Sequence, residues 1–442
     1  MNKLRRLWQD LNASLWFVPS LMVAGAILLA YLLVNIDLRI GREWVSNYPL
    51  LVGAGADGAR GMLAAIAGSM MTVAGLIFSL TLSTLAQVSS QYTPRVLRNF
   101  MRNRTNQVVL GCFVSIFTYC LVVLRTIRGG DDYTFVPALS VAFGLVLALL
   151  GIGVLVFFIH HIASSIQVAN IVAGVTMETE AAIDRLFPEE LGDDAELAEE
   201  AHLFAQAATL AWVPVPARHN GYLQQLDHAG LLALARRLSG VIRMEVGVGS
   251  FAARGAALAS VARYDGRPLP LTPELTAEIN DLFMLNVQRT SDEDAGFGLR
   301  QIVDIALKAL GAHDTSTAVI CLDHLGALLA RLAACRFPSP LRTDDETADT
   351  PVRVVVIRPG FADFTGTALN QIRTAGSGNV GVYLHLLAAL ATAAGPAHRP
   401  ARRAVLLRHL RLTAEAAERT LATEDEKSQV RQRLLAVELL LV

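Results

Sequence analysis

The sequence predicts a membrane protein in two parts: four transmembrane helices, then a cytoplasmic α+β domain that contains a small β-rich segment and several helices. Composition is the first observation behind this prediction, because only 17% of the 442 residues are charged and 53% are hydrophobic. Soluble domains carry about 25% charged residues. The second observation is that the long apolar runs gather in the first third of the chain, while the rest reads as an ordinary soluble protein.

Four apolar stretches are long enough to cross a bilayer, which takes about 20 residues. They are residues 14–34, 61–87, 107–124 and 135–159. A cleavable signal peptide is the alternative for the first stretch. Its apolar run exceeds the usual ~7–15 residues and lacks a small-residue cleavage site, so we expect a membrane anchor.

Basic residues near the spans predict that both termini are cytoplasmic. The N-terminus begins with Lys3, Arg5 and Arg6. The loop between the second and third spans has four arginines and no acidic residue: Arg95, Arg98, Arg102 and Arg104. On the opposite side, arginines are mixed with aspartates and a glutamate.

The second span carries small and hydroxyl side chains along one face. At about 100° per residue, these fall within about 40° of one line: Gly61, Ala65, Gly68, Thr72, Gly75, Ser79, Ser83, Ala86 and Ser90. Such a stripe lets helices pack closely, but a pore lining is also small and polar. In a pore, the lining residues are Thr72, Ser79, Ser83 and Gln87, and Arg95 and Arg98 form a basic inner mouth. The sequence leaves packing seam and pore lining open.

Other features narrow the class of membrane protein. No charged residue lies in the hydrocarbon zone of any span, which argues against a proton-coupled pump with an intramembrane carboxylate. Four spans with one small-residue stripe leave helix surface that another copy of the chain can contact, so we expect a homo-oligomer. A net charge of −1 gives no attraction to nucleic acid. The four cysteines show no disulfide framework.

The soluble part divides by pattern. We expect a transmembrane domain over residues 1–165, a helical linker over 166–210, a β-rich segment over 211–268 and a mainly helical domain over 269–442. Residues 162–186 read as a helical extension of the fourth span. The β-rich segment resembles half of the hammerhead of biotinyl and lipoyl carrier domains. No lysine occurs between Lys3 and Lys308, which excludes a swinging-arm carrier.

Later elements follow from local signals. Thr272 is a predicted N-cap, with Pro273 at the first helical position. "GLRQIVDIALKALG" predicts an amphipathic helix and "PVRVVVI" a short buried strand. Two or three long helices are expected from residue 363 to the end.

No enzyme motif is present: the sequence has no P-loop, H-E-x-x-H, G-x-S-x-G or G-x-G-x-x-G. We therefore predict no enzyme and no cofactor. His160 and His161 are adjacent on a helix and point about 100° apart, so they cannot easily share a metal ion.

"GAHDTSTAV" is the most site-like soluble stretch. The structural interpretation is that Gly311 ends one helix and Asp314 caps the next. The functional interpretation is a ligand loop of His313, Asp314 and Thr317, on which Arg289, Asp292 and Asp294 converge.

Several blocks resemble a widespread bacterial family of predicted membrane proteins of unknown function. They are "FSLTLSTLAQVSSQYTPRVLRNF", "NQVVLGCFVSIFTYCLVVLRTIR", "FFIHHIASSIQ", "GYLQQLD", "GSFAARGAAL", "QRTSDEDAGFGLRQIVDIALKAL" and "ALNQIR". The resemblance covers nearly the whole chain and implies an inner-membrane location, with no activity attached. "LGAHDT" departs from the Pro-Gly-Ile-Asn-Asp-Pro of family members, and Ser250 stands where Asp is frequent.

The leading functional hypothesis is an oligomeric, channel-like or transport-related protein of the bacterial inner membrane, regulated by its cytoplasmic domain. The alternative is a membrane-anchored sensor or scaffold, whose cytoplasmic domain binds a ligand or partner through "RTSDEDAGFG" and "GAHDTSTAV". Its expected partners are the lipid bilayer, further copies of the chain, and a small ligand or ion.

Overall fold

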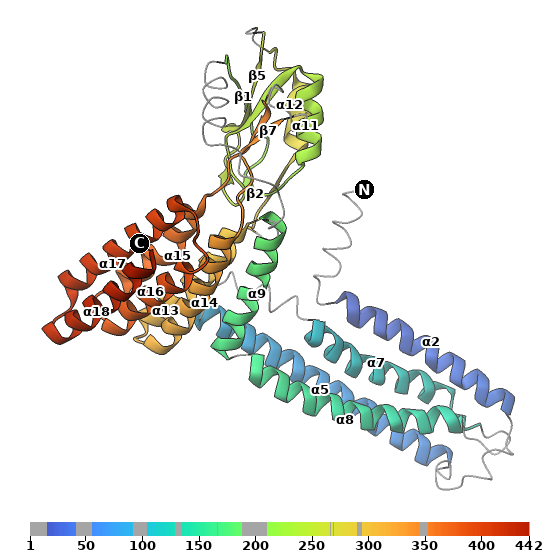
Figure 1. Ribbon diagram of the computed structural model, residues 1–442. Coiled ribbons are helices and arrows are strands. Elements are labelled where there is room, and N and C mark those ends of the chain that lie inside the picture. Colours follow the sequence, from blue (N-terminus) through green and yellow to red (C-terminus); the bar gives the residue numbers. More distant parts are fainter. Residues whose placement is uncertain are drawn as a thin grey trace. The chain divides into compact units, whose positions relative to one another are not determined.

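The computed structural model describes residues 16–40, 55–91, 104–128, 135–165, 167–187, 210–265, 267, 269–289, 294–343 and 352–441. These residues form two compact units that divide between Asn170 and Ile171. The predicted fold class is confirmed, because long apolar helices are followed by a region of helices and small sheets (Figure 1).

Each predicted span corresponds to a helix of the first unit. These helices are α2 (Phe17–Ile40), α5 (Ala56–Gln91), α7 (Arg104–Thr126) and α8 (Ala138–Ser165). All four are long and apolar enough to cross a membrane. With 36 residues, α5 is about 54 Å long at 1.5 Å per residue. A hydrocarbon core is about 30 Å thick, so an untilted α5 extends beyond it.

Helix α7 lies in the middle of this unit and packs against α2, α5 and α8. In its most apolar window, 44% of the α7 residues are buried, against 11% for α2. Most residues of α2 are therefore not covered by the other helices. The Tyr119 hydroxyl donates to the Ser140 carbonyl oxygen of α8 at 2.8 Å. The Tyr119 ring packs edge-on against Phe143, with ring centroids 5.7 Å apart.

A side chain of α2 caps the N-terminus of α8. The first turn of a helix has N–H groups without partners inside the helix, and Pro137, which precedes α8, has no polar side chain with which to cap it. Asp37 supplies the missing acceptor. Its carboxylate accepts from the Leu139 N–H at 2.9 Å, the Ser140 N–H at 3.0 Å and the Ser140 hydroxyl at 2.6 Å.

The predicted helical extension of the fourth span is wrong as a single helix. Helix α8 ends at Ser165, and a separate helix, α9 (Val168–Leu186), follows. The Asn170 side chain donates to the Ser164 carbonyl oxygen at 2.7 Å. It satisfies a carbonyl near the C-terminus of α8, where intrahelical partners run out.

A fifth helix, α14 (Thr315–Ala334), also has the length and composition of a span. It belongs to the second unit, where it packs against α13 (Ala295–Gly311) and α16 (Val380–Ala394). Protein buries 56% of its most apolar window, the largest share among the five helices. Its apolar composition fits burial in a protein core, and the other four helices are the ones that the sequence predicted as spans.

The β-rich part consists of two small sheets. The larger has the strand order β1-β5-β3-β8-β7, in which only the β3–β8 pair is parallel. The smaller has the order β4-β2-β6. The strands are β1 (Val213–Pro216), β2 (Gly221–Leu226), β3 (Gly240–Met244), β4 (Phe251–Ala252), β5 (Ala257–Arg263), β6 (Phe283–Asn286), β7 (Leu341–Thr343) and β8 (Val352–Val355).

This part is less self-contained than the predicted segment 211–268. Strands β6, β7 and β8 come from later in the chain, and β8 supplies the parallel neighbour of β3. Two helices, α11 (His228–Arg237) and α12 (Pro273–Asp281), lie between strands in sequence. The segment is therefore not an independent half-hammerhead. As predicted, Thr272 caps α12, accepting from the Leu275 N–H at 3.2 Å.

Four helices follow residue 360, where two or three were expected. They are α15 (Phe361–Ala375), α16, α17 (Pro400–Thr420) and α18 (Glu424–Leu441). Leu421–Thr423 separates α17 from α18, and the Thr423 N–H and hydroxyl both bond to Glu426 at the start of α18. With α13 and α14, they form the helical part of the second unit (Figure 1).

Candidate functional site

The small-residue stripe of α5 faces away from the helices of its own unit. The buried side of α5 is another line of residues: Ala59, Leu63, Ala67, Met70, Ala74, Ile77 and Thr84. At about 100° per residue, that line lies roughly opposite the stripe. The stripe residues that the structure describes are exposed: Gly61, Ala65, Gly68, Thr72, Gly75, Ser79, Ser83 and Ala86.

The glycines show how empty the space beside the stripe is. A Cβ atom added at Gly61, Gly68 or Gly75 would meet nothing within 4 Å. By contrast, a Cβ at Gly151 of α8 would lie 3.2 Å from the Met70 sulfur. Among the described residues, the stripe therefore packs against no helix of its own chain. A packing seam at this stripe needs a second copy or another protein.

The hydroxyls of the stripe differ in their bonding. Thr72 donates to the Gly68 carbonyl oxygen at 2.9 Å, so its hydroxyl is satisfied along the helix. The Ser79 and Ser83 hydroxyls make no hydrogen bond within the described residues. Gln87 is exposed near the end of the described stripe. Arg95 and Arg98, the predicted basic mouth, lie outside the described residues.

The predicted ligand residues of the second unit fall into two groups at opposite ends of α13. Asp294 caps the N-terminus of α13, while His313 and Asp314 follow its C-terminus. The 17 residues of α13 span about 25 Å. The structure therefore does not bring the two groups together, because a straight helix separates them. Asp292 lies outside the described residues.

At the N-terminus of α13, Arg289 and Asp294 form an ion pair. The Asp294 carboxylate accepts from Arg289 Nε at 3.1 Å and Nη2 at 2.6 Å, and from the Phe297 N–H at 3.0 Å. Burial raises the pKa of Asp294, although the Arg289 guanidinium opposes this shift. Gly249 approaches the pair closely, with φ +81°, and a Cβ there would lie 2.1 Å from the carboxylate. This ion pair joins the β-rich part to α13.

At the other end, the structural interpretation holds. The Asp314 carboxylate caps α14 by accepting from the Thr317 N–H at 3.0 Å. Hydrogen bonds from Thr317 lower the pKa of Asp314. His313 has φ +59° and makes the turn between α13 and α14.

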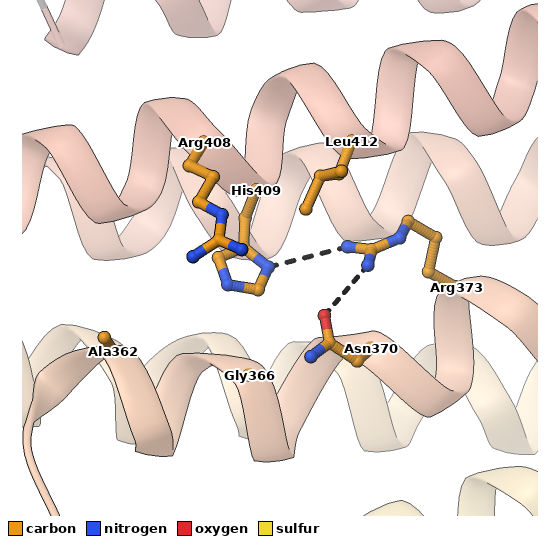
Figure 2. A pocket seen from close by; sticks show the side chains of 7 residues that line it. All are labelled: Ala362, Gly366, Asn370, Arg373, Arg408, His409 and Leu412. Carbon is orange, nitrogen blue, oxygen red and sulfur yellow. Dashed lines mark hydrogen bonds between the residues drawn. The ribbon is translucent and has the colours of Figure 1, made fainter.

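Sequence reasoning missed a hollow between α15 and α17. It has a volume of about 290 Å³ and is lined mainly by polar and basic side chains: Asn370, Arg373, Arg408 and His409, beside Ala362, Gly366 and Leu412. Figure 2 shows the α15 and α17 side chains facing one another across it. The sequence signal was split between "ALNQIR" and "LRHLRL", which no local pattern connects.

Within the described ranges, no group of three or more His, Cys, Asp or Glu side chains is placed to hold a metal ion. All four cysteines are free, and three of them are buried: Cys120, Cys321 and Cys335.

Comparison with known proteins agrees with this architecture. Residues 12–392 match the predicted membrane protein family DUF2254. The chain belongs to this family. DUF2254 relatives include uncharacterised proteins of Mycobacterium bovis and Mycobacterium tuberculosis, each 30% identical over 433 residues, which cover 97% of this chain and 81% of the relative. No solved structure matches the chain. Membership of DUF2254 confirms the resemblance seen in the sequence and the multi-pass membrane character.

Proposed function

We propose that this DUF2254 protein is a homo-oligomeric, channel-like protein of the bacterial inner membrane, with both termini in the cytoplasm. The observation that carries the proposal is the outward direction of the α5 stripe. Copies of α5 face one another around a shared, water-filled path, and the second unit regulates it. The proposal includes no catalytic step and no nucleic-acid partner.

Two features of the stripe favour this arrangement over contact with lipid. First, a hydroxyl group is less costly facing water than facing hydrocarbon, and the Ser79 and Ser83 hydroxyls make no hydrogen bond in the described part of the chain. Second, the stripe itself carries no bulky apolar residue: the exposed Leu76 and Leu82 border it, and others lie further round the helix. Phe78 and Leu80 are 50% and 40% exposed and point about 100° to either side of Ser79.

Cysteine accessibility tests the proposal with a matched control. Single cysteines are placed at Ser79, Ser83, Phe78 and Leu80, in a chain whose four native cysteines are replaced by alanine or serine. A charged, water-soluble methanethiosulfonate reagent is then applied to membranes. Because only water-facing thiols ionise and react, we expect Ser79→Cys and Ser83→Cys to be modified at least tenfold faster than Phe78→Cys and Leu80→Cys.

A flux measurement completes the test. Purified protein in liposomes is expected to pass a small polar solute or ion, and modification of Ser83→Cys is expected to block that flux. Equal, slow modification at all four positions would refute the proposal that the stripe lines a water-filled path. If Gly68→Cys and Gly75→Cys then formed disulfides between copies, the stripe would be a dry packing seam.

The alternative function is a membrane-anchored sensor. Its predicted ligand loop does not form as one site, since the described residues place its two parts at opposite ends of α13. A ligand-binding role for the second unit would need a different place.

A further inference from the structure

We propose that the hollow between α15 and α17 binds a phosphate group, as inorganic phosphate or as a small phosphate ester. This inference concerns only the second unit and is independent of the channel proposal. The inference rests on the guanidinium groups of Arg373 and Arg408, which face one hollow from two helices. Neither has an acidic partner in the described part of the chain.

Arg373 of α15 is held by neutral groups. Its Nη2 donates to Asn370 Oδ1 at 2.8 Å, and its Nη1 lies 3.5 Å from His409 Nδ1 (Figure 2). Its side chain is half-buried, and burial lowers the pKa of Arg373. A buried charge without a counter-charge is costly, and an anion in the hollow would offset this cost.

Several other arginines of the second unit pair with a carboxylate, whereas the buried Arg402 of α17 is held by the Ala333 carbonyl oxygen and two phenylalanine rings. Arg331 pairs with Asp184 at 2.8 Å, Arg289 with Asp294, and Arg431 with Glu418. Arg373 and Arg408 have no such partner within the described residues. Arg373 is partly buried, where long cationic side chains usually find a carboxylate. The exposed Arg408 lines the same hollow, so the two guanidinium groups together point to an external anion.

The local charge is uniformly positive on α17. Its first fifteen residues contain four arginines and no acidic residue. Asp363 is the acidic residue of α15, and its Oδ2 accepts from the Gly360 N–H at 2.8 Å. This carboxylate is therefore engaged at the start of α15.

His409 adds a donor without adding charge. It is 6% exposed, and burial, together with Arg373 and Arg408, lowers its pKa to about 4. A guanidinium can only donate, so Nδ1 accepts from Arg373, and the proton of the neutral ring is on Nε2. The imidazole thus fixes Arg373 on one side and keeps an N–H on the other.

The number of donors favours phosphate over carboxylate. Arg408 has five N–H groups with no partner in the described residues, Arg373 keeps three N–H groups beyond those bonded to Asn370 and His409, and Asn370 has its own amide donors. Arginine forks suit the oxygens of phosphate in bidentate pairs. The volume of about 290 Å³ is at the lower end for ligand pockets, about 300–1,000 Å³, which suits a small anion.

The test uses the full chain in a phosphate-free maltoside detergent. Thermal unfolding is followed while inorganic phosphate is added, against chloride at equal ionic strength. Because the anion would join α15 to α17 in the folded state alone, we expect the Tm to rise with phosphate concentration and not with chloride. A glycerol phosphate series separates the sources: a lower Kd for the ester identifies a phosphate ester, and equal Kd values identify inorganic phosphate.

Variants decide whether the hollow is responsible. Arg373→Gln and Arg408→Gln are each expected to raise the phosphate Kd at least tenfold. Arg419→Gln is the matched control, since it removes an exposed arginine from the last turn of the same helix, and its response should equal that of the wild type. If Arg373→Gln does not fold, exposed Arg408 still gives the answer. A Tm response that survives in Arg408→Gln, or that chloride reproduces, overturns the proposal.

Discussion

Replacing Asp37 by alanine should destabilise the membrane unit far more than removal of an average acidic residue would. The substitution removes the acceptor for three hydrogen bonds at the start of α8. Ser140 is 0% exposed, so its N–H cannot turn to water. Loss of an N-cap costs about 0.5–2 kcal/mol, and leaving a buried donor unsatisfied costs about 1–3 kcal/mol. We expect a combined loss of about 3 kcal/mol in the free energy of unfolding.

The matched control is Asp57→Ala in α5. The Asp57 side chain is 99% exposed and lies 3.4 Å from Arg60, and exposed ion pairs contribute about 0–1 kcal/mol. Both variants would be unfolded reversibly in mixed micelles of maltoside and dodecyl sulfate, with helix content followed by circular dichroism. Equal free energies of unfolding for Asp37→Ala and Asp57→Ala would refute the role of Asp37 as the cap of α8.

Three further predictions concern buried groups. Gly249→Ala should cost about 2 kcal/mol or more, because its Cβ would lie 2.1 Å from the Asp294 carboxylate at φ +81°; Gly255→Ala, at φ +86° in open space, should cost only about 1 kcal/mol from strain, as thermal unfolding would show. Gln107→Met should stabilise the chain by about 1 kcal/mol, because both polar atoms of this buried amide lack a partner in the described residues; destabilisation on urea or dodecyl sulfate titration would mean that the amide is bonded in the membrane. For His409, the folded pKa of about 4 is below the ordinary 6.5, so protonation favours the unfolded chain and stability falls as the pH drops from about 6.5 toward 4. We expect a loss of about 1–2 kcal/mol between pH 7 and 5, which His409→Gln should abolish.

The elements that local rules govern could be predicted from the sequence. Apolar length alone predicts most ends of the four spans to within a few residues. The exceptions are the C-terminal ends of α2 and α8, which lie about six residues beyond the predicted ends. The caps made by Thr272 and Asp314 follow from side chains that bond to backbone three residues ahead. In each case the interacting groups are close in sequence.

The features that arise between distant segments could not be predicted. Asp37 caps a helix that begins about a hundred residues later, and Arg373 meets His409 across 36 residues. The stripe of α5 is visible in the sequence, but its outward direction depends on which side α7 occupies. The failed convergence of Asp294 and Asp314 has the same origin, since proximity was expected where a straight helix intervenes.

The position of α9 has a practical consequence for work on the second unit alone. Gly298 of α13 lies against Thr179, so closely that a Cβ there would be 1.9 Å from the hydroxyl oxygen. The Thr176 hydroxyl lies 2.9 Å from His324 Nδ1, and Arg331 Nε donates to Asp184 Oδ1 at 3.0 Å. Helix α9 is thus an integral wall of this unit, despite its place in sequence beside the membrane helices. A fragment that contains the second unit should begin at Val168, because truncation inside α9 or after it would expose apolar surface of α13 and α14 and favour aggregation.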